Sequence, residues 1–145
     1  MKRFTVFLCV ILISLSAVAA DAPKMPTLYQ RLGGYDAIAA VTDDFIGRLA
    51  TDKQLSRFVV GHSQDSLMKL RQHVVELICV TAGGPCVYIG RDMKTSHQGM
   101  GITESDWNVA VGHLTASLDK FKVGAKEKSE LLGAVSALKK DIVEK

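Results

Sequence analysis

Apolar residues recur along most of the chain at intervals of three and four, which places them on one face of an α-helix. The pattern predicts a short helix over 27–32, which ends at a pair of glycines, and a longer helix over 36–50. A loop over 53–65 follows, and then a long amphipathic helix that ends at Gly83 and Gly84. The alternation of apolar and polar residues that is typical of β-strands is nearly absent, so we expect an all-α fold.

The second half of the chain continues the helical pattern. A short helix is expected over 91–98, with Met93 and His97 four residues apart on one side. Thr103 and Asp106 have the spacing of a capping box and mark the start of a further helix. The last helix is expected to run as one element with four apolar positions in register: Leu131, Val135, Leu138 and Ile142.

The N-terminus has the organisation of a targeting segment. Two basic residues precede an apolar run over 4–15 and a stretch of small residues over 16–20. This order predicts that residues 1–20 are a cleavable secretory signal peptide and that 21–145 are exported as one domain, periplasmic or secreted. The alternative is an uncleaved membrane anchor, but the run is shorter than the roughly 20 residues that a span requires. No stable membrane anchor is expected after cleavage.

Charge and motifs exclude several classes of function. The formal net charge is +3, and Lys2 and Arg3 of the leader carry two of these charges, so nucleic acid is not an implied partner. The chain has no phosphate-binding glycine loop and no Cys-x-x-Cys or Cys-x-x-Cys-His motif. Paired carboxylates and a nucleophilic serine do not stand out either. Histidine remains as the residue type that can carry chemistry.

Five segments, in the same order, resemble the group I truncated haemoglobins. They are TLYQRLGG over 27–34, DDF over 43–45, GGPCVYIGRDM over 83–93, HQGMGI over 97–102 and VGHL over 111–114. The resemblance covers nearly all of the chain after the leader. It implies the truncated-globin fold, a two-over-two helical sandwich around a haem, with haem b (iron protoporphyrin IX) between the long central helix and the short helix that bears His97.

His97 is the candidate proximal ligand of the iron. A neutral imidazole is the usual proximal ligand in globins, and the resemblance places His97 in that role. Taken without the resemblance, a single histidine on a helix is more often a surface or satisfied core residue. His62 and His113 lack a comparable context.

The opposite, distal side of the pocket departs from the family. Relatives commonly have a tyrosine after the Asp-Phe pair and a glutamine on the central helix, whereas this chain has Ile46 and Val74. Leu70, one turn earlier, is apolar too, while Phe45 is retained and Phe58 remains of an aromatic pair. Bound dioxygen acquires partial negative charge, so a pocket without donors should hold it less tightly.

Four further polar residues lie on the elements that would surround the haem. Some cyanobacterial relatives use a histidine at the position of His73 as a second axial ligand, and a solvated histidine at the haem rim is the alternative. Lys69, Arg91 and Lys94 are candidates to bind the propionates, although charged residues on helices are usually only solvated.

Cys79 and Cys86 flank the glycine turn at the end of the central helix. Export would place them where disulfides persist, so they are expected to pair. Two separate buried thiols are the alternative, because the sequence does not show how closely they approach.

The expected function is reversible binding of dioxygen or another diatomic ligand, such as nitric oxide or carbon monoxide, at a His-ligated haem. The donor-poor pocket argues against efficient dioxygen transport or storage and leaves redox, nitric oxide-related and sensing roles open. A nitric oxide dioxygenase-type or peroxidase-like activity, with an unidentified reductase or electron partner, stays open as well. A haem-free exported helical interaction domain is the alternative of another class.

Overall fold

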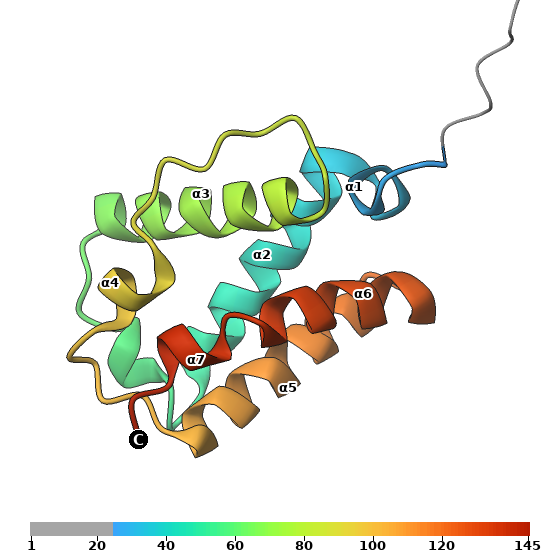
Figure 1. Cartoon of the computed structure of the whole chain (residues 1–145). Helices are drawn as coiled ribbons and strands as arrows, with labels where there is room; N and C mark the ends of the chain where they lie inside the picture. The colour runs from blue at the N-terminus through green and yellow to red at the C-terminus, as the bar shows by residue number, and fades with distance from the viewer. Residues whose placement is uncertain (1–24) are drawn as a thin grey trace, which may run out of the picture.

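The computed structural model describes residues 25–145, and every regular element in this range is helical (Figure 1). The predicted signal peptide over 1–20 lies outside the described residues. The elements are α1 (Leu28–Arg31), α2 (Gly34–Thr51), the 3-10 turn η1 (Ser56–Phe58), α3 (Gln64–Thr81), α4 (Met93–His97), α5 (Glu104–Lys120), α6 (Ala125–Ser136) and α7 (Lys139–Ile142). The all-α prediction is confirmed. None of the helices in 25–145 is both long and apolar enough to cross a membrane.

Side-chain caps explain where several helices begin. The predicted capping box is present: the Asp106 backbone N–H donates to Thr103 Oγ1 at 3.2 Å, and the Thr103 backbone N–H donates to Asp106 Oδ2 at 2.9 Å. Ser63 caps α3 and Asp92 caps α4 in the same way, by accepting from a backbone N–H three residues later. These bonds satisfy N–H groups that have no partner inside the helix.

The helices form two packed layers. In Figure 1, α2 crosses beneath α3 and lies above the pair formed by α5 and α6, and its contacts with α3 and α5 are the most extensive in the described chain. The buried side chains at this crossing form the hydrophobic core and come from four helices: Ile38, Ala39, Val41, Val75, Ile78, Cys79, Leu114, Leu118 and Leu131. Full burial of each large aliphatic side chain contributes roughly 1.5–3 kcal/mol.

The last helix is broken, so its prediction as one continuous element is wrong. The chain leaves α6 after Ser136 and resumes as α7 at Lys139. At the break the Leu138 N–H donates to the Val135 carbonyl at 2.9 Å, a bond between residues three apart, which tightens and redirects the chain. As a result α7 packs against α4.

The C-terminus also holds the segment that follows α4. The Glu144 carboxylate accepts hydrogen bonds from the backbone N–H groups of Gly99 at 2.6 Å and Gly101 at 2.5 Å. These two bonds lower the pKa of Glu144 from its ordinary value. Both glycines have positive φ, 81° and 65°, a conformation that other residues rarely adopt. The hydrogen bonds to Glu144 and the backbone conformation of the two glycines therefore both fix the turn after α4.

Candidate functional site

A large apolar cavity lies between α3 and α4, with α5 and α7 along its other walls. It measures about 1160 Å³ including its open mouth. Cofactor sites typically take roughly 300–1,000 Å³, so the space suits a ligand of cofactor size. Among the described residues that line it, only His97 and Asp106 have ionisable side chains.

The His97 side chain enters this cavity from α4. Its Nδ1 atom lies 2.7 Å from the Met93 carbonyl oxygen, one turn earlier on the same helix. A carbonyl can only accept, so Nδ1 carries the proton and donates it there. Nε2 is then left with a free lone pair, the form of imidazole that binds a metal.

The wall opposite α4 is apolar. Phe45 on α2 and Leu70, Val74 and Leu77 on α3 line it, and Phe58 of η1 lies at its edge. Within residues 25–145, this wall presents no side chain that could donate a hydrogen bond to a bound ligand. The five predicted pocket residues His97, Phe45, Phe58, Leu70 and Val74 thus come together around one cavity.

The remaining predicted residues lie outside the cavity lining. Ile46 is half-buried but does not line the space, because it follows Phe45 by one residue and points about 100° away around α2. Lys69 pairs with Asp65 on the outside of α3, at 2.7 Å between Lys69 Nζ and Asp65 Oδ2. Arg91 and Lys94 are exposed and lie outside the cavity lining, so their contact with the propionates stays a prediction.

His73 occupies the edge of α3 next to Val74. Its ring packs edge-on against the ring of Tyr88, with 6.1 Å between the ring centroids and 73° between the planes. The ring is half-buried and does not line the cavity. In this structure His73 therefore faces the connection between α3 and α4 and not the site of an axial ligand.

Asp106 is a lining residue that the sequence indicated only as a helix cap. Its buried carboxylate accepts from the Thr103 N–H, from Gln54 Nε2 at 2.8 Å and from Arg57 Nη2 at 2.8 Å. These interactions, the Thr103 N–H first, lower the pKa of Asp106 to about 2 against the opposing effect of burial. Asp106 thereby fastens the η1 segment to α5 at the floor of the cavity. Its position three residues after Thr103 was the only signal in the sequence.

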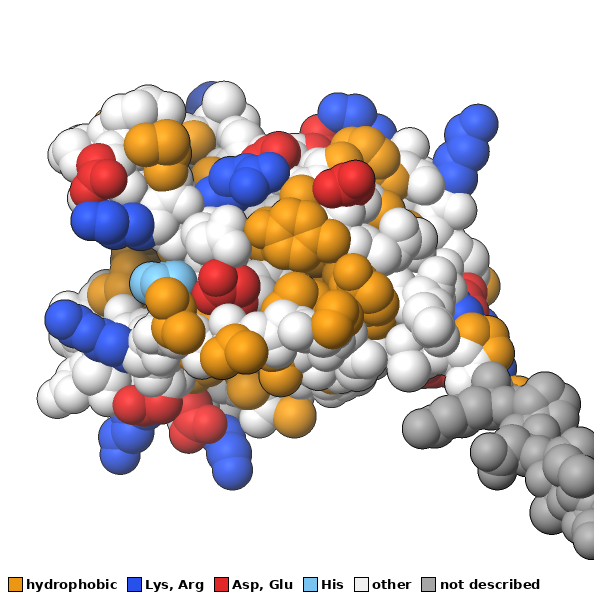
Figure 2. Space-filling view, turned by 90° about the horizontal axis from the view of Figure 1, so that it is seen from above, with side chains coloured by type: hydrophobic (Ala, Val, Ile, Leu, Met, Phe, Trp, Pro, Cys, Tyr) orange, Lys and Arg blue, Asp and Glu red, His pale blue; other side chains and the backbone are white. Residues whose placement is uncertain are grey.

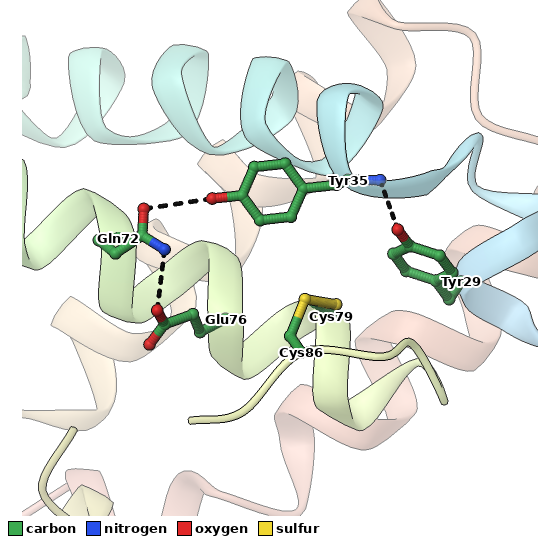
Figure 3. Close-up of a disulfide and its surroundings, with 6 residues drawn as sticks. All are labelled: Tyr29, Tyr35, Gln72, Glu76, Cys79 and Cys86. Carbon is green, nitrogen blue, oxygen red and sulfur yellow. Dashed lines mark hydrogen bonds between the residues drawn. A yellow bond between two sulfur atoms is a disulfide. The ribbon is translucent and has the colours of Figure 1, made fainter. Parts of the chain in front are cut away.

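Cys79 and Cys86 form a disulfide between the buried face of α3 and the connection that follows it (Figure 3). Their Cα atoms are 5.9 Å apart. Gly84 lies inside this turn, where an added Cβ would sit 2.5 Å from a ring carbon of Tyr29 and 2.6 Å from Cys79 Sγ. Only glycine fits there without displacing one of the two.

A row of polar side chains runs beside the disulfide in Figure 3. The Tyr35 hydroxyl donates to Gln72 Oε1 at 3.2 Å, and Gln72 Nε2 donates to Glu76 Oε1 at 2.8 Å. The Tyr29 hydroxyl in turn accepts from the Tyr35 backbone N–H at 3.0 Å. These bonds join the start of α2 to the middle of α3 on the side away from the cavity.

The connection between α3 and α4 carries exposed apolar side chains. Val87 is 73 % exposed and Ile89 is 76 % exposed. Figure 2, which views the molecule from the side of α3, shows apolar side chains gathered on this face among scattered charges. Tyr88, the one residue between them, instead packs against His73 of α3.

Comparison with known proteins assigns the family. The model of the bacterial-like globins matches residues 27–144. The group 1 truncated haemoglobin GlbN of Mycolicibacterium paratuberculosis is 36% identical over 116 residues, which cover 80% of this chain and 83% of that protein. GlbN of Nostoc commune is 31% identical over 121 residues, covering 83% of this chain and 100% of that protein.

Solved structures agree on the fold. The truncated haemoglobin of Tetrahymena pyriformis superimposes with a TM-score of 0.75 at 23% identity, over 83% of this chain and 100% of that one. The 2/2 haemoglobin of a Synechococcus species superimposes with a TM-score of 0.74 at 24% identity and the same coverage. The chain belongs to the bacterial-like globin family, as a group 1 truncated haemoglobin with the two-over-two helical fold.

Proposed function

We propose that the protein binds haem b in the cavity between α3 and α4, with His97 as proximal ligand, and reversibly binds a diatomic ligand on the opposite side. The observation that supports this is the fixed tautomer of His97, whose Nε2 is free inside an otherwise apolar space. Haem, when bound, supplies an iron atom that accepts dioxygen, nitric oxide or carbon monoxide. Membership of the globin family supports the binding of diatomic ligands at haem in general. The identity of the ligand is part of the proposal.

The apolar distal wall favours ligands that need no hydrogen bond. Dioxygen bound to haem iron is polarised and gains from a donor, whereas carbon monoxide depends on one far less. Val74 and Leu70 offer no donor. We therefore favour nitric oxide chemistry, sensing or electron exchange with a reductase over dioxygen transport.

His73 is proposed as a second axial ligand when no external ligand is present. It adjoins Val74 on α3, and Leu70 and Leu77, one turn away on either side, both line the cavity. To reach the iron its ring must leave Tyr88 and α3 must shift toward α4. In a six-coordinate site of this kind only the protein with His73 off the iron can bind a gas. The apparent affinity is therefore the intrinsic affinity multiplied by the fraction of this open protein.

The haem is proposed to be held without a covalent bond. The lining contains no cysteine to form a thioether with a vinyl group, and its single histidine is engaged as the iron ligand. The Synechococcus haemoglobin, by contrast, is described with covalently attached haem. Acid butanone should extract the haem completely from this protein, and the pyridine complex should have the spectrum of unmodified protoporphyrin IX.

Export is proposed from the order of basic, apolar and small residues at the N-terminus, and a disulfide at Cys79 and Cys86 is in keeping with an oxidising compartment. Expression with the leader, followed by mass determination of the protein outside the cytoplasm, tests this. We expect a chain that begins at Asp21.

The decisive experiment for the function is reconstitution with haem followed by absorption spectroscopy. A Soret band with one haem per chain, and its shift on adding carbon monoxide to the ferrous form, are the expected results. A protein that folds but takes up no haem would overturn the proposal and leave the haem-free interaction domain.

A further inference from the structure

The ring of Tyr88 contacts the ring of His73 outside the cavity lining. The two rings meet edge-on at 6.1 Å between centroids, and His73 lies on the helix that forms the distal wall. An imidazole cannot keep this contact and also extend over the haem. The contact and the ligation of iron by His73 therefore exclude one another.

The position of Tyr88 is itself fixed by three features of its own segment. Its hydroxyl donates to the Arg91 carbonyl oxygen at 2.6 Å. Its ring lies directly over Gly90, where an added Cβ would sit 2.3 Å from the Tyr88 hydroxyl oxygen. Two residues before it, Cys86 is bonded to Cys79 of α3. The ring is thus held close to the same helix that carries His73.

We propose that Tyr88 is a positioning residue that sets how often His73 reaches the iron, and that the Cys79–Cys86 disulfide holds it in place. This inference rests on the proposed role of His73 as a second axial ligand. An aromatic contact of this kind changes an equilibrium by roughly two- to tenfold. Loss of the Tyr88 ring should raise the ratio of His73-bound to open protein by that factor.

The test compares variants of the haem-loaded protein by their ferric and ferrous absorption spectra and by the rate of carbon monoxide binding. Tyr88→Ala should increase the six-coordinate, low-spin fraction and slow carbon monoxide binding by up to roughly tenfold, because the gas binds only while His73 is off the iron. Tyr88→Phe keeps the ring and should shift the fraction less. Val87→Ala, an exposed neighbour in the same segment, is the matched control and should behave as wild type.

Gly90→Ala provides a second route to the same result. The added methyl group occupies the space of the Tyr88 hydroxyl and displaces the ring while leaving Tyr88 itself intact. Cys86→Ser releases the segment from α3 and should shift the six-coordinate fraction in the same direction. Agreement among these variants would separate the placement of Tyr88 from a general loss of stability.

A readout that does not depend on ligation comes from chemical modification of His73. In the ferric protein saturated with cyanide the sixth position is occupied, so His73 is off the iron in every variant. Tyr88→Ala should then speed the reaction of His73 with diethyl pyrocarbonate, measured by peptide mass mapping. The exposed His62 serves as an internal standard and should not change.

The outcomes separate this inference from the proposed function. If His73→Ala leaves the low-spin fraction of the wild type unchanged, His73 is not a ligand and both ideas fall. If His73→Ala abolishes that fraction while Tyr88→Ala and Gly90→Ala leave it unchanged or reduce it, the inference alone is overturned. An increase in both variants, absent when His73→Ala is added, supports it.

Discussion

The imidazole of His97 donates its Nδ1 proton to the carbonyl oxygen of Met93, 2.7 Å away and one turn earlier on α4. Because Asp92 caps this short helix and Glu144 holds the turn that follows it, the imidazole is fixed in both tautomer and direction. The bond also raises the electron density on Nε2, the atom that faces the cavity. The proposed ligation of iron by His97 therefore requires no rearrangement of α4.

Replacement of His97 should remove most of the haem. In His97→Ala no other imidazole lines the cavity within the described chain, so the purified protein is expected to contain little haem or to hold it weakly through His73. The absorbance ratio of the Soret band to the protein band measures this. His62→Ala, in an exposed loop, is the control and should retain full haem content.

Imidazole added to His97→Gly gives a sharper form of the same experiment. The free base should enter the space left by the side chain and restore haem binding. Wild-type haem affinity and spectra in His97→Ala without added imidazole would show that the iron is held elsewhere.

Restoring a donor to the distal wall should slow the release of dioxygen. Val74 lines the cavity, so Val74→Gln would place an amide beside the bound ligand. One hydrogen bond of about 1 kcal/mol corresponds to roughly fivefold slower dissociation, measured by stopped-flow displacement with carbon monoxide.

Two variants test whether the amide itself is responsible. Val74→Leu adds volume without a donor and should not slow dissociation. Ile46→Tyr adds a hydroxyl at a residue outside the lining and should act less strongly than Val74→Gln. Equal rates in Val74→Gln and Val74→Leu would contradict a role for hydrogen bonding at this wall.

Loss of the disulfide should destabilise the fold measurably. In the chain-entropy model, closing so short a loop contributes about 2.5 kcal/mol. The free energy of unfolding of Cys86→Ser, measured with urea, should therefore be lower than that of the wild type by about this amount. Intact mass after alkylation, with and without prior reduction, should reveal two thiols that are protected only in the unreduced protein. Alkylation of both without a reductant, in protein kept oxidised, would show that the bridge is not formed.

Stability should fall at acid pH through Asp106. The pKa of its carboxyl is lowered to about 2 in the folded chain, against about 3.9 for an unfolded aspartate. The depressed value means that the ionised carboxylate stabilises the fold above pH 4, and that this contribution is lost as the pH falls through 4 toward 2.

Asp106→Asn should therefore be less stable than wild type at pH 7, by roughly 1.5–3 kcal/mol for a hydrogen-bonded charge, and the gap should narrow as the pH falls. Urea unfolding followed by circular dichroism at pH 7 and pH 3 measures the gap. Asp65→Asn alters an exposed ion pair and should stay within about 0.5 kcal/mol at both pH values. A gap that is the same at both pH values would mean that the Asp106 charge is not the cause.

Much of this protein follows from the sequence alone. The spacing of apolar residues predicted the helices over 27–32, 36–50 and 91–98, which the structure contains within about two residues at each end. The family was evident from the ordered motifs, and these placed His97 on its short helix. Such features depend on neighbours three or four residues apart, and this is the range over which sequence patterns report geometry.

The tertiary structure alone decided which way the side chains at the edges of the helices point. His73 and Val74 are adjacent, yet Val74 lines the cavity while His73 meets Tyr88 from a connection that comes after the helix. Asp106 likewise acquires Arg57 as a partner from 49 residues away. Neighbouring side chains on a helix are about 100° apart, so a helical pattern does not determine which of two neighbours at the edge of the apolar face enters a cavity. Contacts between distant segments of the chain decide that.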